Sequence, residues 1–286
     1  MNLQTNPSVS VIITTYNMEK FIGETLSSVI NQTYKNFEVI LVDDSSEDKT
    51  LEIVKTYALK DDRIKYFMIN HAGLPSVPRN FGISKSNSDL IAFLDGDDLW
   101  DKFKLQEQVI FFLKHPEMNF IYSMSVTFGE VNIFSPFYEV LPLLHKAAIT
   151  RDELIKNGNS ITCSTVLVKT EVIKQNGGFD EDPKLKAVED YDLWLRISEK
   201  GSFGFVPRIH AYYRVHKNQS SADWQTKQAR LECLSAKHKL NLPAYRFYRN
   251  KNIVIRLARN LLHYLTYLRA KSSSFFDSKN KSTDWN

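Results

Sequence analysis

The chain reads Ile91-Ala92-Phe93-Leu94-Asp95-Gly96-Asp97-Asp98-Leu99-Trp100 at residues 91–100. The apolar run at the start has no polar break, which predicts a strand buried on both faces of a sheet. It ends in three carboxylates within four positions. Because like charges repel, this arrangement favours a site where a cation and a polyphosphate lie among them, at the strand end where open α/β sheets bind ligands. A solvated acidic turn is the alternative interpretation.

Strands and helices alternate before this stretch. The expected elements are strands at residues 8–13, 37–42 and 64–69 and helices at residues 21–30 and 50–59. A short helix that carries Arg79 leads into the strand of residues 91–95. Alternation over about 100 residues predicts a parallel, doubly wound sheet.

Polar side chains also follow the first two predicted strands. Residues 14–17 read Thr-Thr-Tyr-Asn, and residues 43–46 read Asp-Asp-Ser-Ser. Both groups lie at predicted strand ends and are candidates for ligand binding. The Asp and Ser residues are also good caps for the next helix, so part of the second signal has a purely structural explanation.

The second half of the chain shows weaker patterns. The expected elements are a helix to about residue 114, strands at 120–126, 162–168 and 208–214, and a helix that starts near residue 187. Residues 128–148 are rich in Phe, Tyr and Pro, which favours a loop or flap over a site. Glu189 and Asp190 lie in the first turn of the predicted helix, where Glu189 and Asp192 have a structural interpretation as solvated capping residues.

The composition is that of an ordinary globular protein, with 43% hydrophobic and 24% charged residues among 286. The length allows one large core or two modest domains. Cys163 and Cys233 cannot form a disulfide framework, so a reducing compartment is expected. We find no signal-peptide pattern and no apolar stretch near the ~20 residues that a membrane span needs. A cytoplasmic location follows as the expectation.

The charge is divided unevenly along the chain. Residues from 224 onward contain 13 Lys+Arg against 3 Asp+Glu, which leaves 24 against 30 in residues 1–223. We therefore expect a chemical domain at 1–223, a basic amphipathic helical extension at 224–271 and a disordered tail at 272–286. The wide apolar face of residues 252–270 needs a partner. The catalytic domain, a second subunit and the surface of an anionic membrane all remain open.

The chain lacks the glycine-rich motifs that cradle phosphate. There is no GxGxxG after a strand and no GxxxxGK[ST], so side chains and a metal ion would have to hold a nucleotide. Asp95 and Asp97 are suited to that task. The same stretch is also similar to the nucleophile loop of haloacid-dehalogenase-type phosphatases. Leu99 at the position of their Thr or Val, and three preceding strands, argue against that family.

Seven short motifs together resemble the family 2 inverting glycosyltransferases, which have the GT-A nucleotide-sugar fold. The motifs stand in the same order over residues 9–196, although each alone is weak. They are residues 9–17, 31–33, 42–46, Arg79-Asn80-x-Gly82, 94–98, 177–181 and 189–196. The resemblance implies a mixed sheet with a Rossmann-like nucleotide-sugar half and an acceptor half, followed here by an appended helical region.

The resemblance assigns the nucleotide side of the site to residues from three motifs. Thr14 and Tyr16 match positions at the nucleotide base, with the Tyr16 ring beside it. Asp44 matches the aspartate that accepts a hydrogen bond from the base. Asp95 matches the position near the ribose or a metal-bound water, and Arg79 a basic position near the donor sugar or pyrophosphate.

The remaining roles concern the metal and the proton. The resemblance implies that Asp97 is the direct ligand of Mn²⁺ or Mg²⁺ and that Asp190 is the general base. His216 matches a position close to the pyrophosphate that assists the metal, although this match is short. Departure of a nucleoside diphosphate develops charge that a divalent ion stabilises, and the acceptor hydroxyl needs a base.

We therefore expect an inverting glycosyltransferase that moves a sugar from a nucleotide sugar to a saccharide or glycolipid. The expected donor is a UDP-sugar, with TDP- and GDP-sugars left open, and the expected setting is bacterial surface polysaccharide synthesis. The expected location is the cytoplasm or the inner face of the membrane. A non-catalytic protein that binds sugar nucleotides or assembles complexes is the alternative. Nucleic-acid binding is not expected, because no recognition motif or exposed aromatic platform accompanies the basic tail.

Other residues have blunter interpretations. Trp100 and Trp194 are expected in the core or a pocket wall, and His71 is expected to be structural or exposed. Cys163 lies in a run of small residues that lines the acceptor site or serves packing alone.

Overall fold

The computed structural model describes residues 5–129, 140–142, 147, 149–201, 203–216 and 224–243. Most of the predicted flap at 128–148 lies outside these residues. The same holds for the apolar face at 252–270 and for the tail at 272–286.

The described chain contains strands and helices in alternation through its first half. The strands are β1 (Val9–Thr15), β2 (Phe37–Asp43), β3 (Ile64–Met68), β4 (Leu90–Asp95), β5 (Leu99–Trp100), β6 (Phe120–Gly129), β7 (Val140–Leu141), β8 (Leu167–Lys169) and β9 (Phe203–Val215). The helices are α1 (Ile22–Ile30), α2 (Thr50–Ala58), α3 (Ser76–Lys85), α4 (Lys104–Lys114), α5 (Arg151–Asn157), α6 (Thr170–Gln175), α7 (Glu189–Ser198) and α8 (Trp224–His238). Two 3₁₀ turns, η2 (Cys163–Thr165) and η3 (Pro183–Leu185), complete the set.

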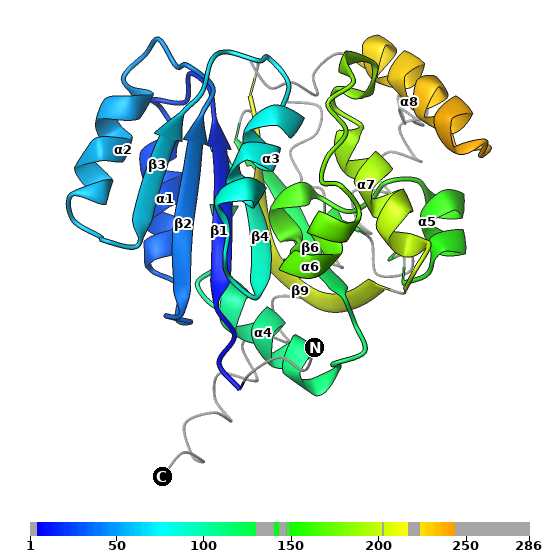
Figure 1. The fold of residues 1–286 in the computed structure, drawn as a ribbon, viewed down its shortest axis with the longest axis horizontal. Helices are drawn as coiled ribbons and strands as arrows, with labels where there is room; N and C mark the ends of the chain where they lie inside the picture. Colours follow the sequence, from blue (N-terminus) through cyan, green and yellow to red (C-terminus); the bar gives the residue numbers. More distant parts are fainter. Residues whose placement is uncertain are drawn as a thin grey trace, which may run out of the picture.

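The strands of the described residues form one mixed sheet in the order β3-β2-β1-β4-β8-β6-β9-β5, with β7 paired to β6 (Figure 1). Strands β3, β2, β1 and β4 are parallel to one another. Beyond β4 the directions are mixed, because β8 runs antiparallel to both β4 and β6, whereas β9 runs parallel to β6. The parallel first half and the mixed sheet as a whole confirm the predicted GT-A type of architecture.

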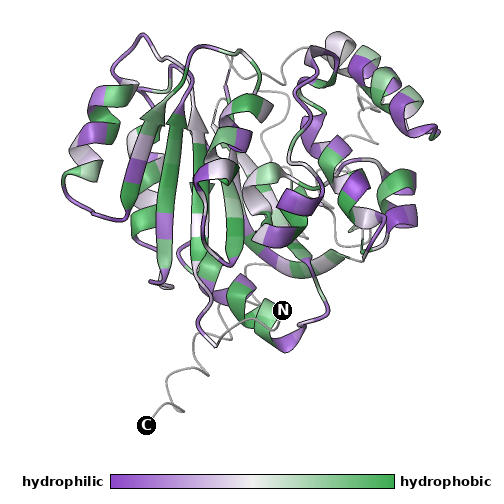
Figure 2. Cartoon of the chain, viewed as in Figure 1, coloured by the Kyte–Doolittle hydropathy of each residue, from purple (hydrophilic) through white to green (hydrophobic). Residues whose placement is uncertain are grey.

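The central strands are buried on both faces, as the apolar run of β4 predicts. Ile91 and Phe93 point into a core shared with α6 and α7, whereas Ala92 and Leu94 point into a core shared with α1 and α4. Successive side chains of a strand point to opposite faces, so a strand covered on both sides must be apolar throughout. Figure 2 shows the resulting hydrophobic colour along β1, β2 and β4.

The predicted strand at 162–168 is wrong in its first half. Residues 163–165 form η2, and only residues 167–169 pair as β8. The hydroxyl of Thr165 donates to the carbonyl of Thr162 at 2.7 Å. Local hydrogen bonds of this kind, from Ser and Thr side chains to nearby backbone groups, compete with strand pairing. The short α5 and the two-residue strands β5 and β7 had no counterpart among the predicted elements.

The first helix after residue 223 packs onto the preceding domain. Leu231 and Leu234 of α8 are buried in the same core as Trp194 of α7. Figure 1 places α8 with α7 and α5 on the side of the sheet away from α1 and α2. Among the described residues, we find no helix with the length and apolar character to cross a membrane.

Candidate active site

The carboxyl ends of β1, β2 and β4 meet at one edge of the sheet, which we call the strand-end edge. In the parallel register Thr15 lies opposite Asp43, and Thr14 lies opposite Asp95. The backbone amide of Asp44 donates to the carbonyl of Thr15 at 2.9 Å. Polar residues that are far apart in the sequence are therefore neighbours here, as the parallel sheet predicts.

Asp44 and Tyr16 form one side of this edge together with the loop that follows β3. The Asp44 carboxylate accepts the amides of Ala72 at 2.7 Å and Gly73 at 3.0 Å. The ring of His71 stacks on Tyr16, with centroids 4.4 Å apart, and its Nδ1 lies 3.0 Å from the Asp44 carboxylate. No local sequence pattern places His71 at the site, because its partners are 27 or more residues away.

The neighbouring Asp43 has a structural task. Its carboxylate accepts the backbone amide of Ser46 at 2.8 Å and the Ser46 hydroxyl at 2.6 Å. These bonds close the turn that leads toward α2. Asp43 therefore has a structural role, but it does not cap α2, which follows Lys49 and has no side-chain cap. Asp44, by contrast, lies beside Tyr16 and His71.

The three carboxylates after β4 form the acidic turn, residues 95–98, and each has a different partner. Asp97 lies with its Oδ2 atom 2.8 Å from Nε2 of His216, so the structure brings these two predicted residues together. The guanidinium of Arg214 donates to the carbonyl of Asp97 at 2.7 Å. Both partners come from the end of β9, 117 or more residues further along the chain.

Asp98 is fully buried and serves the fold. It accepts the hydroxyl of Ser164 at 2.6 Å and the backbone amide of Arg214 at 2.9 Å. Burial, together with the charges of Asp97 and Asp95, raises the pKa of Asp98 well above its usual range. Of the three carboxylates from which the sequence predicts ligand binding, Asp98 therefore connects the acidic turn to β9.

Gly96 is required by the close approach of the acidic turn to β1. Its amide donates to the carbonyl of Thr14 at 2.9 Å. A Cβ atom at this position would lie 2.9 Å from the same carbonyl and 3.0 Å from Oγ1 of Thr15. Such contacts are closer than van der Waals separation, so a larger residue would push the acidic turn away from the strand-end edge.

Arg79 links the acidic turn to the start of α7. Its Nη2 atom lies 2.7 Å from Asp95, its Nη1 atom lies 2.7 Å from Glu189, and only 5% of the residue is exposed. Burial works against the charge, yet the neighbouring acidic groups, Asp95 and Glu189 among them, outweigh it and raise the pKa of Arg79 well above its usual range. The guanidinium is thus held by two carboxylates from distant elements.

Asp190 lies next to Glu189 at the helix start and is half-buried. Its Oδ1 accepts the amide of Tyr191 at 2.7 Å. The thiol of Cys163 lies close to these charged groups. Burial raises the pKa of Cys163 well above its usual range. The charge of Arg79 lowers this pKa, and the charges of Asp95, Asp190 and Glu189 raise it. The ion pairs of Arg79 join the acidic turn to Glu189, the residue that precedes Asp190.

Two structural interpretations of the α7 sequence are wrong. Glu189 and Asp192 were expected as solvated capping residues, but Glu189 is 5% exposed and Asp192 is fully buried. Both make long-range ion pairs that the local pattern cannot reveal. Trp100 and Trp194, by contrast, are buried in the core as expected.

The residues at the acidic turn suit a divalent cation that arrives with a nucleotide. Among the described residues, no three His, Cys, Asp or Glu side chains converge as a metal site. Carboxylates suit Mg²⁺ and Mn²⁺, and Mg²⁺ is often bound by one or two of them with phosphate oxygens and water. Asp97, 15% exposed and oriented by His216, fits such a partial ligand set.

The sequence is similar to those of known glycosyltransferases. The family model described as "Glycosyl transferase family 2" matches residues 10–175. The chain is 35% identical over 219 residues to the UDP-Glc:alpha-D-GlcNAc-diphosphoundecaprenol beta-1,3-glucosyltransferase WfaP of Escherichia coli, covering 75% of this chain and 80% of WfaP. It is 30% identical over 223 residues to TuaG of Bacillus subtilis, described as a putative teichuronic acid biosynthesis glycosyltransferase, covering 77% of this chain and 84% of TuaG.

Solved structures share the fold. The S. aureus TarS 1-349 complex with UDP-GlcNAc has a TM-score of 0.65 and 24% identity, covering 82% of this chain and 68% of that chain. The mannosyltransferase PcManGT from Pyrobaculum calidifontis, in complex with GDP-Man and Mn²⁺, has a TM-score of 0.64 and 19% identity, covering 100% of this chain and 79% of that chain. The chain thus shares the fold of these two proteins.

Proposed function

The chain belongs to glycosyl transferase family 2, and we propose that it transfers a sugar, with inversion, from a UDP-sugar to a hydroxyl of a saccharide or lipid-linked acceptor. The family makes the chain a glycosyltransferase, as the motifs predicted. The observation that carries the proposal is the ion-pair chain from Asp95 through Arg79 to Glu189. It joins the acidic turn to the helix start that bears Asp190.

We assign the nucleoside to the side of the strand-end edge formed by Thr14, Tyr16 and Asp44. The Tyr16 and His71 rings offer a flat surface beside a buried carboxylate. A carboxylate has about four acceptor sites, so Asp44 keeps capacity for a base N–H after accepting two loop amides. A uracil base is the preferred occupant, because WfaP is named for UDP-Glc and a TarS complex holds UDP-GlcNAc.

Asp97 is our proposed ligand for Mn²⁺ or Mg²⁺ on the diphosphate, with His216 orienting its carboxylate. A bound divalent ion would offset the charge that develops on the departing diphosphate. Asp95 lies nearer the ribose or a metal-bound water in this proposal. Arg79 belongs to the donor side and acts through Asp95, since both of its terminal nitrogens already hold carboxylates.

Asp190 is our proposed general base. An acceptor hydroxyl is a weak nucleophile near neutral pH, and a carboxylate within hydrogen-bond reach takes its proton as the new bond forms. With the diphosphate on one face of the sugar and the base on the other, a single displacement inverts the anomeric centre. The half-buried position of Asp190 at the end of the Arg79 ion-pair chain supports the assignment.

We also propose that residues 1–223 form the catalytic domain and that the basic extension after them approaches an anionic membrane. The excess of 13 Lys+Arg over 3 Asp+Glu from residue 224 onward supports that attraction. WfaP is named for an acceptor linked to diphosphoundecaprenol, a lipid. Cosedimentation with vesicles should be strong with phosphatidylglycerol and weak with phosphatidylcholine alone. Equal binding to both would contradict an electrostatic contact.

Calorimetric titration with UDP and with GDP tests the donor half of the proposal. We expect UDP to bind in the presence of Mn²⁺, with affinity lost on addition of EDTA and in Asp97→Ala. Tighter binding of GDP would move the proposal to GDP-sugars. Absence of binding by either nucleotide, with a folded protein in a thermal melt, would overturn it.

A further inference from the structure

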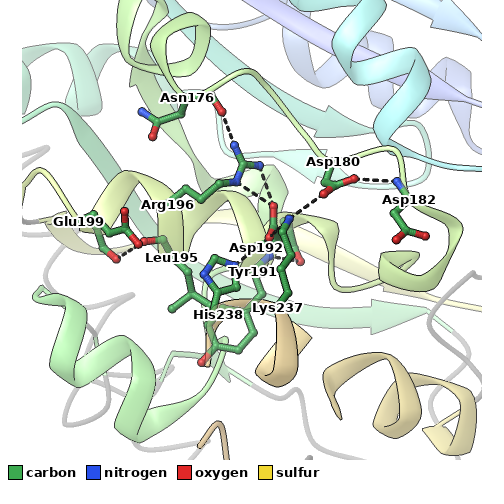
Figure 3. A network of polar contacts seen from close by, with 12 residues as sticks. Asn176, Asp180, Asp182, Tyr191, Asp192, Leu195, Arg196, Glu199, Lys237 and His238 are labelled. Atoms are coloured by element: carbon green, nitrogen blue, oxygen red, sulfur yellow. Dashed lines mark hydrogen bonds and ion pairs between the residues drawn. The ribbon is translucent and has the colours of Figure 1, made fainter. Parts of the chain in front are cut away.

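Asp192 lies at the centre of a network of polar contacts between α7 and α8 (Figure 3). Its side chain is fully buried. One carboxylate oxygen accepts Nε and Nη2 of Arg196 at 2.9 and 2.7 Å. The other accepts Nζ of Lys237 at 2.5 Å and Nε2 of His238 at 2.9 Å. Three basic groups from two helices thus share one carboxylate.

The network also includes the loop that precedes α7. Arg196 donates to the carbonyls of Asn176 and Gly178, and Lys237 forms a second ion pair with Asp180 at 2.6 Å. Burial works against the charge of Asp192, but the bonds from His238, Lys237 and Arg196 outweigh it and lower the pKa of the carboxyl well below its usual range. Asp192 therefore stays ionised and holds the loop, α7 and α8 together.

The start of α7 has little local support. Val188 caps the helix with no side-chain hydrogen bond, although helix starts gain stability from such caps. Ala187, just before it, has a φ of 64°, a left-handed conformation that a residue with a Cβ atom adopts at a cost. Contacts with other elements must therefore fix the direction in which α7 begins.

Those contacts lie on two sides of the first turn. Positions 190 and 192 are about 200° apart around an α-helix, so Asp190 and Asp192 point in nearly opposite directions. Glu189 is held by Arg79 on the side of the acidic turn. Asp192 is held from behind by the end of α8.

We propose that Lys237 and His238, acting through Asp192, are positioning residues that hold the first turn of α7 and thereby set the position of Asp190. The effect on transfer rests on the proposed function of Asp190, whereas the anchoring of α7 does not. Helix α8, which follows residue 223, then supports the helix that carries the proposed base. The nucleotide side lies on β1, β2 and β4, whereas this network lies between α7, α8 and the loop that follows α6.

The test compares the double variant Lys237→Gln/His238→Gln with Lys239→Gln, which removes an exposed charge from the residue that follows α8. Hydrogen exchange should be at least tenfold faster at the amides of residues 188–193 in the double variant and unchanged in β1 and β4. Lys239→Gln should match the wild type. Unchanged exchange in α7 of the folded double variant would overturn the anchoring, whether or not the protein transfers sugar.

Turnover separates positioning from structure. We expect kcat for UDP release from a UDP-sugar to fall about tenfold in the double variant, because small displacements of a catalytic group are costly. The dissociation constant of UDP with Mn²⁺ should stay within twofold, and Lys237→Arg should keep most of the activity. Faster exchange in α7 with unchanged kcat would overturn the link to Asp190. If the double variant does not fold, the single variant His238→Gln takes its place under the same criteria.

Discussion

The two sides of the site are built in different ways. On the nucleotide side, the strand-end edge is made by parallel neighbours, and Asp44 and Gly96 are held by backbone groups one strand away. On the side of α7, Glu189 and Asp192 are held by side chains 110 and 45 residues distant. The first arrangement follows from strand pairing. The second exists only when the mixed part of the sheet has formed, so variants should separate the two sides.

The largest effect is expected from Asp190→Asn, which should sharpen the contrast. Loss of a general base costs about 10²- to 10⁴-fold in rate. The amide keeps the size of the side chain and can still accept the Tyr191 amide. UDP-sugar turnover, measured as UDP release, should fall by that factor, while calorimetric UDP affinity with Mn²⁺ stays within about twofold.

Asp152→Asn is a matched control for Asp190→Asn. Asp152 also lies in the first turn of a helix, α5, and should tolerate the change without loss of turnover. A turnover of Asp190→Asn within threefold of the wild type would exclude Asp190 as the base. Loss of UDP binding in the same variant would contradict the separation of the two sides.

Glu189→Gln should weaken the link between the sides. Removing one partner of a buried ion pair destabilises a protein by about 3–5 kcal/mol, and we expect the lower end because Arg79 keeps Asp95. Urea unfolding measures the change in free energy. Glu199→Gln, at the far end of α7, removes an ion pair whose carboxylate is 53% exposed and should cost about 0–1 kcal/mol. If the two variants lose the same free energy of unfolding, the buried ion pair between Arg79 and Glu189 contributes no more to stability than the exposed pair of Glu199.

This difference between the two sides also explains what the sequence predicted. The nucleotide side could be found because an unbroken apolar run and the polar residues after it define a strand and its end within ten positions. Asp95, Asp97 and Asp44 were located in that way, and the structure brings His216 to within 2.8 Å of Asp97. Asp98, by contrast, stabilises the fold through hydrogen bonds from Ser164 and Arg214. The local pattern could not predict this role, because both partners are remote in the sequence.

The side of α7 was predicted less completely for the same physical reason. The helix period located α7 and placed Asp190 in its first turn. It could not show that Glu189 and Asp192 are buried, because burial of a carboxylate depends on a cation from another element. Arg79 and Lys237 supply those cations from 110 and 45 residues away.

Gly96→Ala should damage the nucleotide side alone. The added Cβ would lie 2.9 Å from the Thr14 carbonyl, so the acidic turn must move. Overpacking of this kind costs about 1–3 kcal/mol, and a similar loss in UDP binding corresponds to about five- to 150-fold. Gly23→Ala in α1 is the control, since its nearest contact would be an ordinary 3.7 Å from Tyr57. Unchanged UDP affinity in Gly96→Ala would separate the acidic turn from nucleotide binding.

The smallest effect concerns His210, which reports on the mixed part of the sheet rather than on the site. His210 of β9 is 2% exposed, and its Nε2 lies 3.0 Å from Glu107 of α4. Burial lowers the pKa of His210, Glu107 opposes that shift, Lys104 adds to it, and Asp101 opposes it. The folded state therefore favours the neutral ring relative to the unfolded chain.

Stability from His210 should accordingly be complete above the unfolded pKa of about 6.5 and should decline as the pH falls through that value, because the unfolded chain then binds more protons. The melting temperature of the wild type should fall more between pH 7.5 and pH 5.5 than that of His210→Gln, by a few degrees. UDP affinity at pH 7.5 should be the same in both proteins, since His210 lies outside the strand-end edge. If the melting temperature of His210→Gln falls with pH as much as that of the wild type, β9 and α4 tolerate the charged ring of His210. The loss of stability in acid would then come from other groups.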